Sequence, residues 1–264
     1  MSWIELAAYL GTGAIAGLMA GLLGVGGGVI VVPALVWLFT KAGFAPEWIF
    51  HLAVGTSLTI LIGTGSASAY SHHRRGAVRW DLVRILVPGL VIGAWLGSAA
   101  AGLLDETWLR RIFGLFLLYV GANMLWKPTQ GTAGELPGAM AMRLAGTGIG
   151  TISALLGIGG GVMTVPFLSR SGLDMRHAVA SSAACGPPIA LAGALGFVLV
   201  GWGNQALPPG STGFVYWPAV AGVLLASAPA APIGARLAHS LPLPMLKRIF
   251  AVLLLAVALK LLLR

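Results

Sequence analysis

The chain is a succession of apolar segments separated by short polar or glycine-rich connections. Most of these segments reach the roughly 20 residues with which a helix crosses a hydrocarbon core about 30 Å thick. The pattern predicts an all-α polytopic membrane protein with ten segments, at Ile4–Leu23, Val29–Phe39, Ile49–Tyr70, Leu82–Leu103, Leu109–Trp126, Ala141–Leu156, Val162–Leu168, Ala178–Val200, Val215–Leu237 and Met245–Leu263.

The ten segments fall into two copies of one pattern. Leu22–Leu35 reads LLGVGGGVIVVPAL and Leu155–Leu168 reads LLGIGGGVMTVPFL, which agree at ten of fourteen positions. Further matches follow in the same order, Ala53–Ser57 with Ala178–Ser182 and Arg110–Phe113 with Lys247–Phe250. A shared order of this kind indicates a duplication.

Each copy holds five segments, and five is odd, so the second copy must enter the membrane from the side opposite to the first. This is the inverted-topology repeat that is common among secondary transporters. We expect glycine-broken helices of the two copies to meet near the midplane. The predicted parts are a first repeat over residues 1–127, a linker over 128–140 and a second, inverted repeat over 141–264.

Composition and charge support a membrane location. Hydrophobic residues make up 58% of the 264 residues and charged ones 9%, with a net charge of +9. Basic loops that orient a membrane protein explain this excess, so nucleic-acid binding is not predicted. If the segments alternate sides, eleven basic residues share one face (Arg74, Arg75, Arg79, Arg84, Lys127, Arg143, Arg170, Arg176, Arg236, Lys247 and Arg248) and five the other (Lys41, Arg110, Arg111, Lys260 and Arg264). The richer face is predicted to be cytoplasmic, with both termini outside, in a bacterial-type inner membrane.

The glycine runs are predicted to turn the chain inside the membrane. A helix over Val29–Thr40 would rise only about 18 Å, too little to cross the bilayer core. Non-helical backbone at such depth needs protein around it or a cavity beside it. Each run would thus leave a helix N-terminus, with free N–H groups and a positive dipole end, inside the membrane, where it suits an anion. The alternative is that these glycines only allow close helix packing.

We call Gly24–Val29 the first elbow and Gly157–Val162 the second elbow. Neither has the Gly-Lys-Ser/Thr of a nucleotide-binding loop. Hydroxyls beside the elbows could donate to an oxyanion or bond back to their own helices. The predicted substrate site comprises Gly24, Gly26, Gly27, Gly28, Val29 and Pro33 in the first copy, Gly157, Gly159, Gly160, Gly161, Val162 and Pro166 in the second, and the hydroxyl residues Thr56, Ser57, Ser181 and Ser182.

At these residues the sequence resembles the sulfite exporter TauE/SafE family, also called the toluene sulfonate uptake permease family. The resemblance rests on Gly24–Gly28 with Pro33, on Gly157–Gly161 with Pro166, and on the RRIFG sequence of Arg110–Gly114. In the second copy Ala251 replaces Gly114 and departs from that pattern. The resemblance implies transport of sulfite, sulfonates, thiosulfate or related sulfur oxyanions.

The charged residues bear on the mechanism. No Asp or Glu lies in the middle of a predicted segment, whereas proton-coupled carriers usually keep a carboxylate there. We therefore expect uniport or loosely coupled exchange, and efflux along the membrane potential. An anion channel and an importer of a different small anion stay open. No enzyme activity, cofactor or metal is predicted. Gly186-Pro187-Pro188 is expected to kink or break its helix. His51, at a segment end, is expected to be an interfacial or loop residue.

Overall fold

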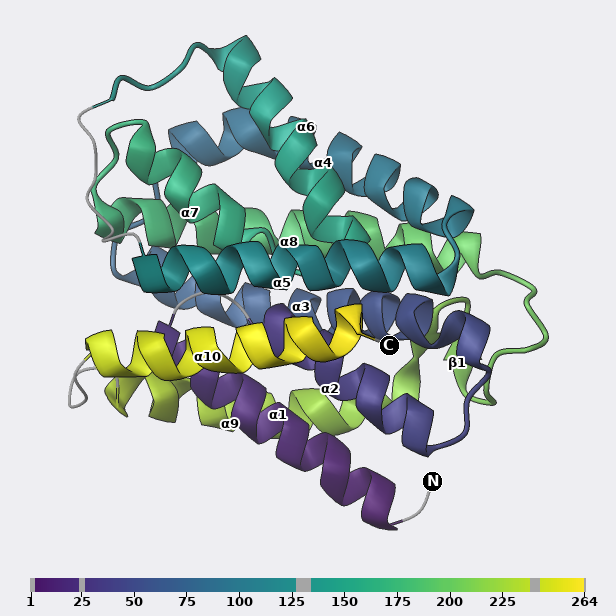
Figure 1. The fold of residues 1–264 in the computed structure, drawn as a ribbon. Helices are drawn as coiled ribbons and strands as arrows, with labels where there is room; N and C mark the ends of the chain where they lie inside the picture. The colour runs from purple at the N-terminus through teal and green to yellow at the C-terminus, as the bar shows by residue number, and fades with distance from the viewer. Residues whose placement is uncertain (1–2, 24–26, 127–133, 238–242, 264) are drawn as a thin grey trace.

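The computed structural model describes residues 3–23, 27–126, 134–237 and 243–263. Over these ranges the chain forms helices that match the predicted segments in number and order (Figure 1). The elements are α1 (Trp3–Leu23), α2 (Gly28–Lys41), the 3-10 turn η1 (Pro46–Trp48), α3 (Ile49–Arg74), α4 (Trp80–Leu103), α5 (Glu106–Trp126), α6 (Ala139–Leu155), α7 (Gly161–Arg170), α8 (Met175–Val200), β1 (Ser211–Thr212), β2 (Val215–Tyr216), α9 (Trp217–Leu237) and α10 (Leu243–Leu262).

The start of α9 differs from the prediction, and α8 has no break at its two prolines. Val215 and Tyr216 were expected to be helical, but they form strand β2, which pairs antiparallel with β1. Pro218 then occupies the first turn of α9, where its missing N–H costs least. Helix α8 continues through Pro187 and Pro188 without a break. Its packing against α3 and α4 supports the turn in which the prolines remove two N–H donors.

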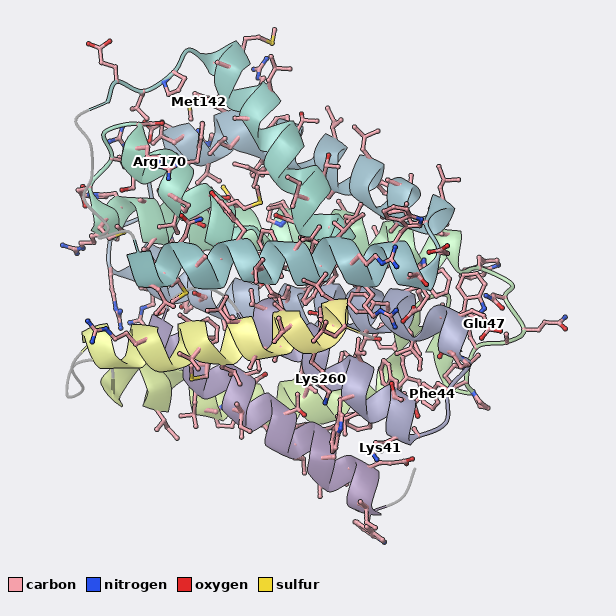
Figure 2. All side chains as sticks on the ribbon, in the orientation of Figure 1. Lys41, Phe44, Glu47, Met142, Arg170 and Lys260 are labelled. Carbon is pink, nitrogen blue, oxygen red and sulfur yellow. The ribbon has the colours of Figure 1, made fainter. Side chains whose placement is uncertain are left out.

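The surface of the helices is that of a multi-pass membrane protein. In the described part of the chain, four helical stretches are long and apolar enough to span a bilayer, namely α1, η1 with α3, α4 and α8. Large apolar side chains such as Leu115, Leu225 and Leu259 are more than half exposed, as expected where lipid is the solvent. Figure 2 shows the two ends of the molecule, with Lys41 and Glu47 at one end and Arg170 at the other.

Two pairs of helices cross at matching glycines. Helix α1 packs along α9, and α6 packs along α4. A methyl group on Gly13 would overlap the carbonyl of Val223, and one on Gly146 would overlap the carbonyl of Leu86. Small residues at such crossings let helix backbones approach closely. One turn further, the same relation holds for Gly17 with Ser227 and for Gly150 with Leu90. In each case the residues occupy equivalent positions of the two aligned copies.

Further helix pairs complete the bundle. Helix α3 packs against α8, and α5 lies beside α10 (Figure 1). The short helix α2 packs on α3 just as the short helix α7 packs on α8. The half of α3 that begins at Ile49 is almost completely buried. The elbows therefore lie against the two central helices, α3 and α8.

Candidate functional site

The second elbow turns through two left-handed glycines. Gly157 has φ +69° and Gly160 has φ +73°, a region that glycine enters without steric penalty. Gly160 is the N-cap of α7, and its carbonyl accepts the first helical bonds, from the N–H groups of Met163 at 3.0 Å and Thr164 at 2.8 Å. The N–H groups of Gly161 and Val162 precede these bonds, so they have no partner within the helix.

The first elbow has the same hydrogen-bond frame where it is described. Gly27 is the N-cap of α2, and its carbonyl accepts from Ile30 and Val31, each at 3.0 Å. Its φ is −70°, so this glycine is not left-handed. Gly24 and Gly26 lie outside the described residues. Gly28 lies against the carbonyl of Gly157, so the two elbows are in contact.

Both elbows lead into helices that are too short to span a bilayer. The 14 residues of α2 rise about 21 Å and the 10 residues of α7 about 15 Å, against a hydrocarbon core of about 30 Å. Pro33 and Pro166 are each the sixth residue of their helix. Val29 is buried, and Val162 packs against the core from a partly buried position.

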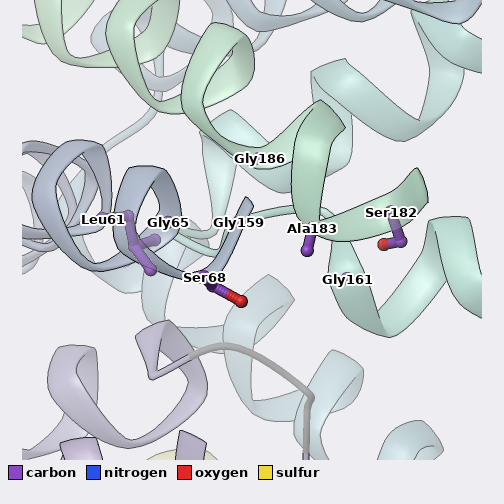
Figure 3. A pocket seen from close by; sticks show the side chains of 8 residues that line it. All are labelled: Leu61, Gly65, Ser68, Gly159, Gly161, Ser182, Ala183 and Gly186. Atoms are coloured by element: carbon purple, nitrogen blue, oxygen red, sulfur yellow. The ribbon is translucent and has the colours of Figure 1, made fainter. Parts of the chain in front are cut away.

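A small cavity lies beside the second elbow (Figure 3). Its walls come from the elbow, from α3 and from α8, through Gly159, Gly161, Leu61, Gly65, Ser68, Ser182, Ala183 and Gly186. Its volume is about 50 Å³, several times the 10–15 Å³ or so that one water molecule needs. In Figure 3 the hydroxyls of Ser68 and Ser182 point toward one another across this space. None of the lining side chains is ionisable, so fixed backbone dipoles and hydroxyls set the electrostatics.

The four predicted hydroxyl residues divide into three kinds of environment. Ser57 donates to the carbonyl of Gly157 at 2.8 Å, which ties α3 to the second elbow. The hydroxyl of Thr56 accepts the N–H of Tyr216, and that of Ser181 accepts the N–H of Arg79, both at 3.0 Å. Arg79 immediately precedes α4, and Tyr216, the last residue of β2, immediately precedes α9, at equivalent positions of the copies. Ser182 alone of the four lines the cavity.

Two further hydroxyls reach the second elbow and were not predicted. The hydroxyl oxygens of Ser153 in α6 and Thr164 in α7 each lie 3.5 Å from the point that a Cβ on Gly160 would occupy. Both side chains are completely buried. The sequence did contain a signal, because the ungapped alignment of the copies places them opposite Ala20 and Val31, which carry no hydroxyl.

A second buried polar cluster lies at the beginning of α3. His51, expected at the interface, is fully buried. Its Nε2 lies 3.0 Å from the Ala101 carbonyl and 3.1 Å from that of Leu104. The neighbouring N–H of Phe50 donates to the carboxylate of Glu106 at 2.8 Å. These contacts satisfy the ends of α4 and α3 at their junction with α5, which is a structural role.

Long apolar helices around two short helices, with a small cavity at an interrupted turn, are typical of a helical membrane transporter. The chain belongs to the sulfite exporter TauE/SafE family, whose model matches residues 9–261.

The relatives are described as membrane transporters as well. A probable membrane transporter protein of Haemophilus influenzae is 36% identical over 254 residues, which are 96% of each chain. Another, of Methanocaldococcus jannaschii, is 28% identical over 70% of each chain. A third, of Bacillus subtilis, is 24% identical over 88% of this chain and 89% of its own. No solved structure matches.

Proposed function

We propose that this protein exports a small sulfur oxyanion, of the sulfite, thiosulfate or organosulfonate class, across the inner membrane. The observation that carries the proposal is the cavity at the N-terminus of α7, lined by Gly159, Gly161 and Ser182. A helix N-terminus offers free N–H groups and a positive dipole end to an anion. The name of the family supports sulfur as the central atom.

The alternating-access part of the proposal rests on an inverted repeat over residues 1–127 and 141–264. Three sets of equivalent contacts support it, namely the glycine crossings of α1 with α9 and α6 with α4, the N-caps Gly27 and Gly160, and the hydroxyl contacts of Thr56 and Ser181. Rocking of one repeat against the other around a fixed site is the usual mechanism of such folds.

The proposed orientation places both termini outside the cytoplasm. The loop between α3 and α4 contains Arg75 and Arg79, and Arg176 at the beginning of α8 donates to the Arg75 carbonyl at 3.4 Å. These basic groups gather at the end of α3 that lies nearest to exposed Ser68 of the cavity. In this orientation the exposed Ser68 of the cavity wall lies toward the cytoplasmic, cation-rich face, from which an exported anion would enter.

Two matched labelling sites test the orientation in a Cys185→Ala background. Glu47 and Arg75 are both exposed and lie at opposite ends of α3. We expect a membrane-impermeant maleimide to label Glu47→Cys in intact cells and Arg75→Cys only after permeabilisation. The reverse labelling would refute the proposed orientation.

Flux into proteoliposomes tests the function. An inside-negative potential favours exit of an anion by about 2.3 kcal/mol per charge per 100 mV. We expect saturable sulfite or sulfonate flux that responds to a potassium diffusion potential set with valinomycin and is insensitive to a pH gradient. Flux driven only by a proton gradient would contradict uniport or loosely coupled exchange. A conductance that does not saturate would favour the anion-channel alternative.

A further inference from the structure

We propose that His51 and Glu106 form a proton-binding site at one end of the bundle, where uptake of one proton strengthens the contact that holds α3 to α4 and α5. The pair is distinct from the proposed anion site. His51 and Leu61 of the cavity wall are ten residues apart in α3, so about 15 Å of helix separates them. The inference therefore goes beyond the proposed function.

The contacts of His51 fix the position of its ring hydrogen. Its Nε2 lies 3.0 Å from the carbonyl oxygen of Ala101 and 3.1 Å from that of Leu104, at the end of α4. A carbonyl oxygen only accepts hydrogen bonds, so Nε2 must carry the hydrogen and donate it. A neutral imidazole has one N–H group, which leaves Nδ1 with a bare lone pair.

This lone pair faces the carboxylate of Glu106. The distance from Nδ1 to Oε2 is 4.0 Å. Nδ1 has no hydrogen-bond partner among the described residues, although His51 is completely buried. Oε2 already accepts the N–H of Phe50 at 2.8 Å. Two acceptors therefore face each other without a hydrogen between them, which is unfavourable for buried groups.

One proton supplies the missing donor. Placed on the carboxyl of Glu106, it gives an O–H group that can donate to Nδ1. Placed on Nδ1, it gives an imidazolium that can donate to the carboxylate, and such charge-assisted hydrogen bonds are the stronger kind. In either case a shift of about 1 Å brings the two groups to hydrogen-bond distance. Protonation thus converts a repulsive contact between α3 and α5 into an attractive one.

The elements packed around the pair bring few charged groups to it. Asp105 and Arg110 lie close enough to act on Glu106 electrostatically. Helix α4 contributes the two carbonyls, and the rings of Trp48 and Phe214 pack against the imidazole. The charged residues Glu47 of η1 and Lys260 of α10 are exposed.

Burial favours the protonated form as well. Removal from water raises the pKa of the Glu106 carboxyl from its ordinary value of 4.5 to about 7, although the N–H of Phe50 and the charge of Arg110 lower it. Glu106 precedes the predicted membrane segment Leu109–Trp126, and 19% of its side chain is exposed. Water at this end of the molecule can therefore deliver the proton. In the proposed orientation this end faces outside.

The second copy of the repeat has no such pair. The residues aligned with His51 and Glu106 are Arg176 and Leu243. Arg176 is exposed at the beginning of α8. The pH on one side of the membrane is therefore expected to act on the buried pair.

An exposed pair in the same region of the second copy provides a matched control. Asp174 and His177 contact each other with 61% and 36% of their side chains exposed. The hydrogen bond from His177 lowers the pKa of the Asp174 carboxyl, so this carboxyl stays ionised above its ordinary value of 3.8. Asp174 therefore adds no change in stability between about pH 5 and about pH 8.

The pH dependence of stability tests the inference, with the purified full chain in detergent. A raised pKa means that the folded chain binds the proton more tightly than the unfolded chain. The stabilisation is complete below about pH 4.5 and is lost as the pH rises through about 7. We expect the wild-type unfolding midpoint to fall between about pH 5 and about pH 8. Glu106→Gln should abolish this fall, since an amide does not titrate, and Asp174→Asn should keep it.

Nuclear magnetic resonance of nitrogen-15-labelled histidine provides a second readout on the wild-type protein. The variant His51→Gln identifies the His51 signals. At high pH we expect a hydrogen on Nε2 and none on Nδ1. On acidification the Nδ1 signal should shift over the pH range in which the midpoint rises, and Glu106→Gln should remove this shift.

A wild-type pH dependence of the midpoint in Glu106→Gln would overturn the inference. If that variant does not fold, the resonance experiment on the wild-type protein decides. An Nδ1 signal that does not change with pH, or a hydrogen on Nδ1 at high pH, would equally overturn it. Neither measurement involves an anion, so the proposed function stands or falls separately.

Discussion

The two elbows share a backbone frame but differ in what they offer a ligand. In each, a glycine N-cap carbonyl accepts two N–H groups at the beginning of a short helix. The second elbow has left-handed Gly160, a cavity beside it and hydroxyls without a partner among the described residues, whereas Gly27 of the first elbow has φ −70°. Ser57 of the first copy donates to the second elbow at Gly157. The two elbows thus have similar N-cap hydrogen bonds but different surroundings.

The largest expected difference between the elbows is steric. A Cβ on Gly160 would lie 2.7 Å from the Cδ1 of Ile189 and would have to adopt φ +73°. A Cβ on Gly27 would meet nothing closer than 3.6 Å. We expect Gly160→Ala to lower the free energy of unfolding by about 2 kcal/mol and Gly27→Ala to be nearly neutral. Apparent unfolding midpoints in detergent measure this, and equal losses would contradict the described difference.

The next largest expected effect is the loss of stability when the equivalent hydroxyls of Thr56 and Ser181 are removed. Thr56→Val leaves the buried N–H of Tyr216 without its acceptor, and Ser181→Ala removes the acceptor of the partly buried Arg79 N–H. Each change should destabilise the protein by about 1–2 kcal/mol. Because the contacts are equivalent, we expect similar shifts in the unfolding midpoint. A loss confined to one variant would weaken the case for a symmetric repeat.

The smallest expected effect is a difference in stability between variants of Ser57 and Ser182, which align in the two copies. Ser57→Ala removes the donor to the Gly157 carbonyl and should lower stability by about 1 kcal/mol. Ser182→Ala removes a hydroxyl without a partner among the described residues, so it should leave ligand-free stability unchanged or higher. Unfolding midpoints without any added anion provide the comparison. If Ser182→Ala proves the more destabilising, its hydroxyl has a structural partner.

The fold was largely predictable from the sequence because the bilayer restricts the options to helices whose length can be counted. The prediction failed at Val215 and Tyr216. These residues are as apolar as those of the predicted helix, but they form a strand, and the hydroxyl of Thr56 accepts the N–H of Tyr216. At Pro187 and Pro188, where a kink or a break was expected, neighbouring helices pack against an α8 that has no break.

The candidate site was predictable only in part. Repetition drew attention to what the copies share, such as the glycines and the hydroxyl pairs. Ser153 and Thr164 have no hydroxyl counterpart in the first copy, so a search for shared residues does not find them. The different uses of Thr56, Ser57, Ser181 and Ser182 depend on which helix faces each hydroxyl, and a single sequence does not contain that information.

The most direct test of the central claim, that the anion passes through the cavity at the second elbow, is flux through Gly159→Ala compared with Gly27→Ala. A Cβ on Gly159 fits beside Leu61 at 3.6 Å, so the variant should fold while a methyl group enters the cavity. In proteoliposomes with equal amounts of folded protein, we predict at least a tenfold loss of sulfite or sulfonate flux in Gly159→Ala and near wild-type flux in Gly27→Ala. Undiminished flux in Gly159→Ala, or an equal loss in both variants, would contradict the claim.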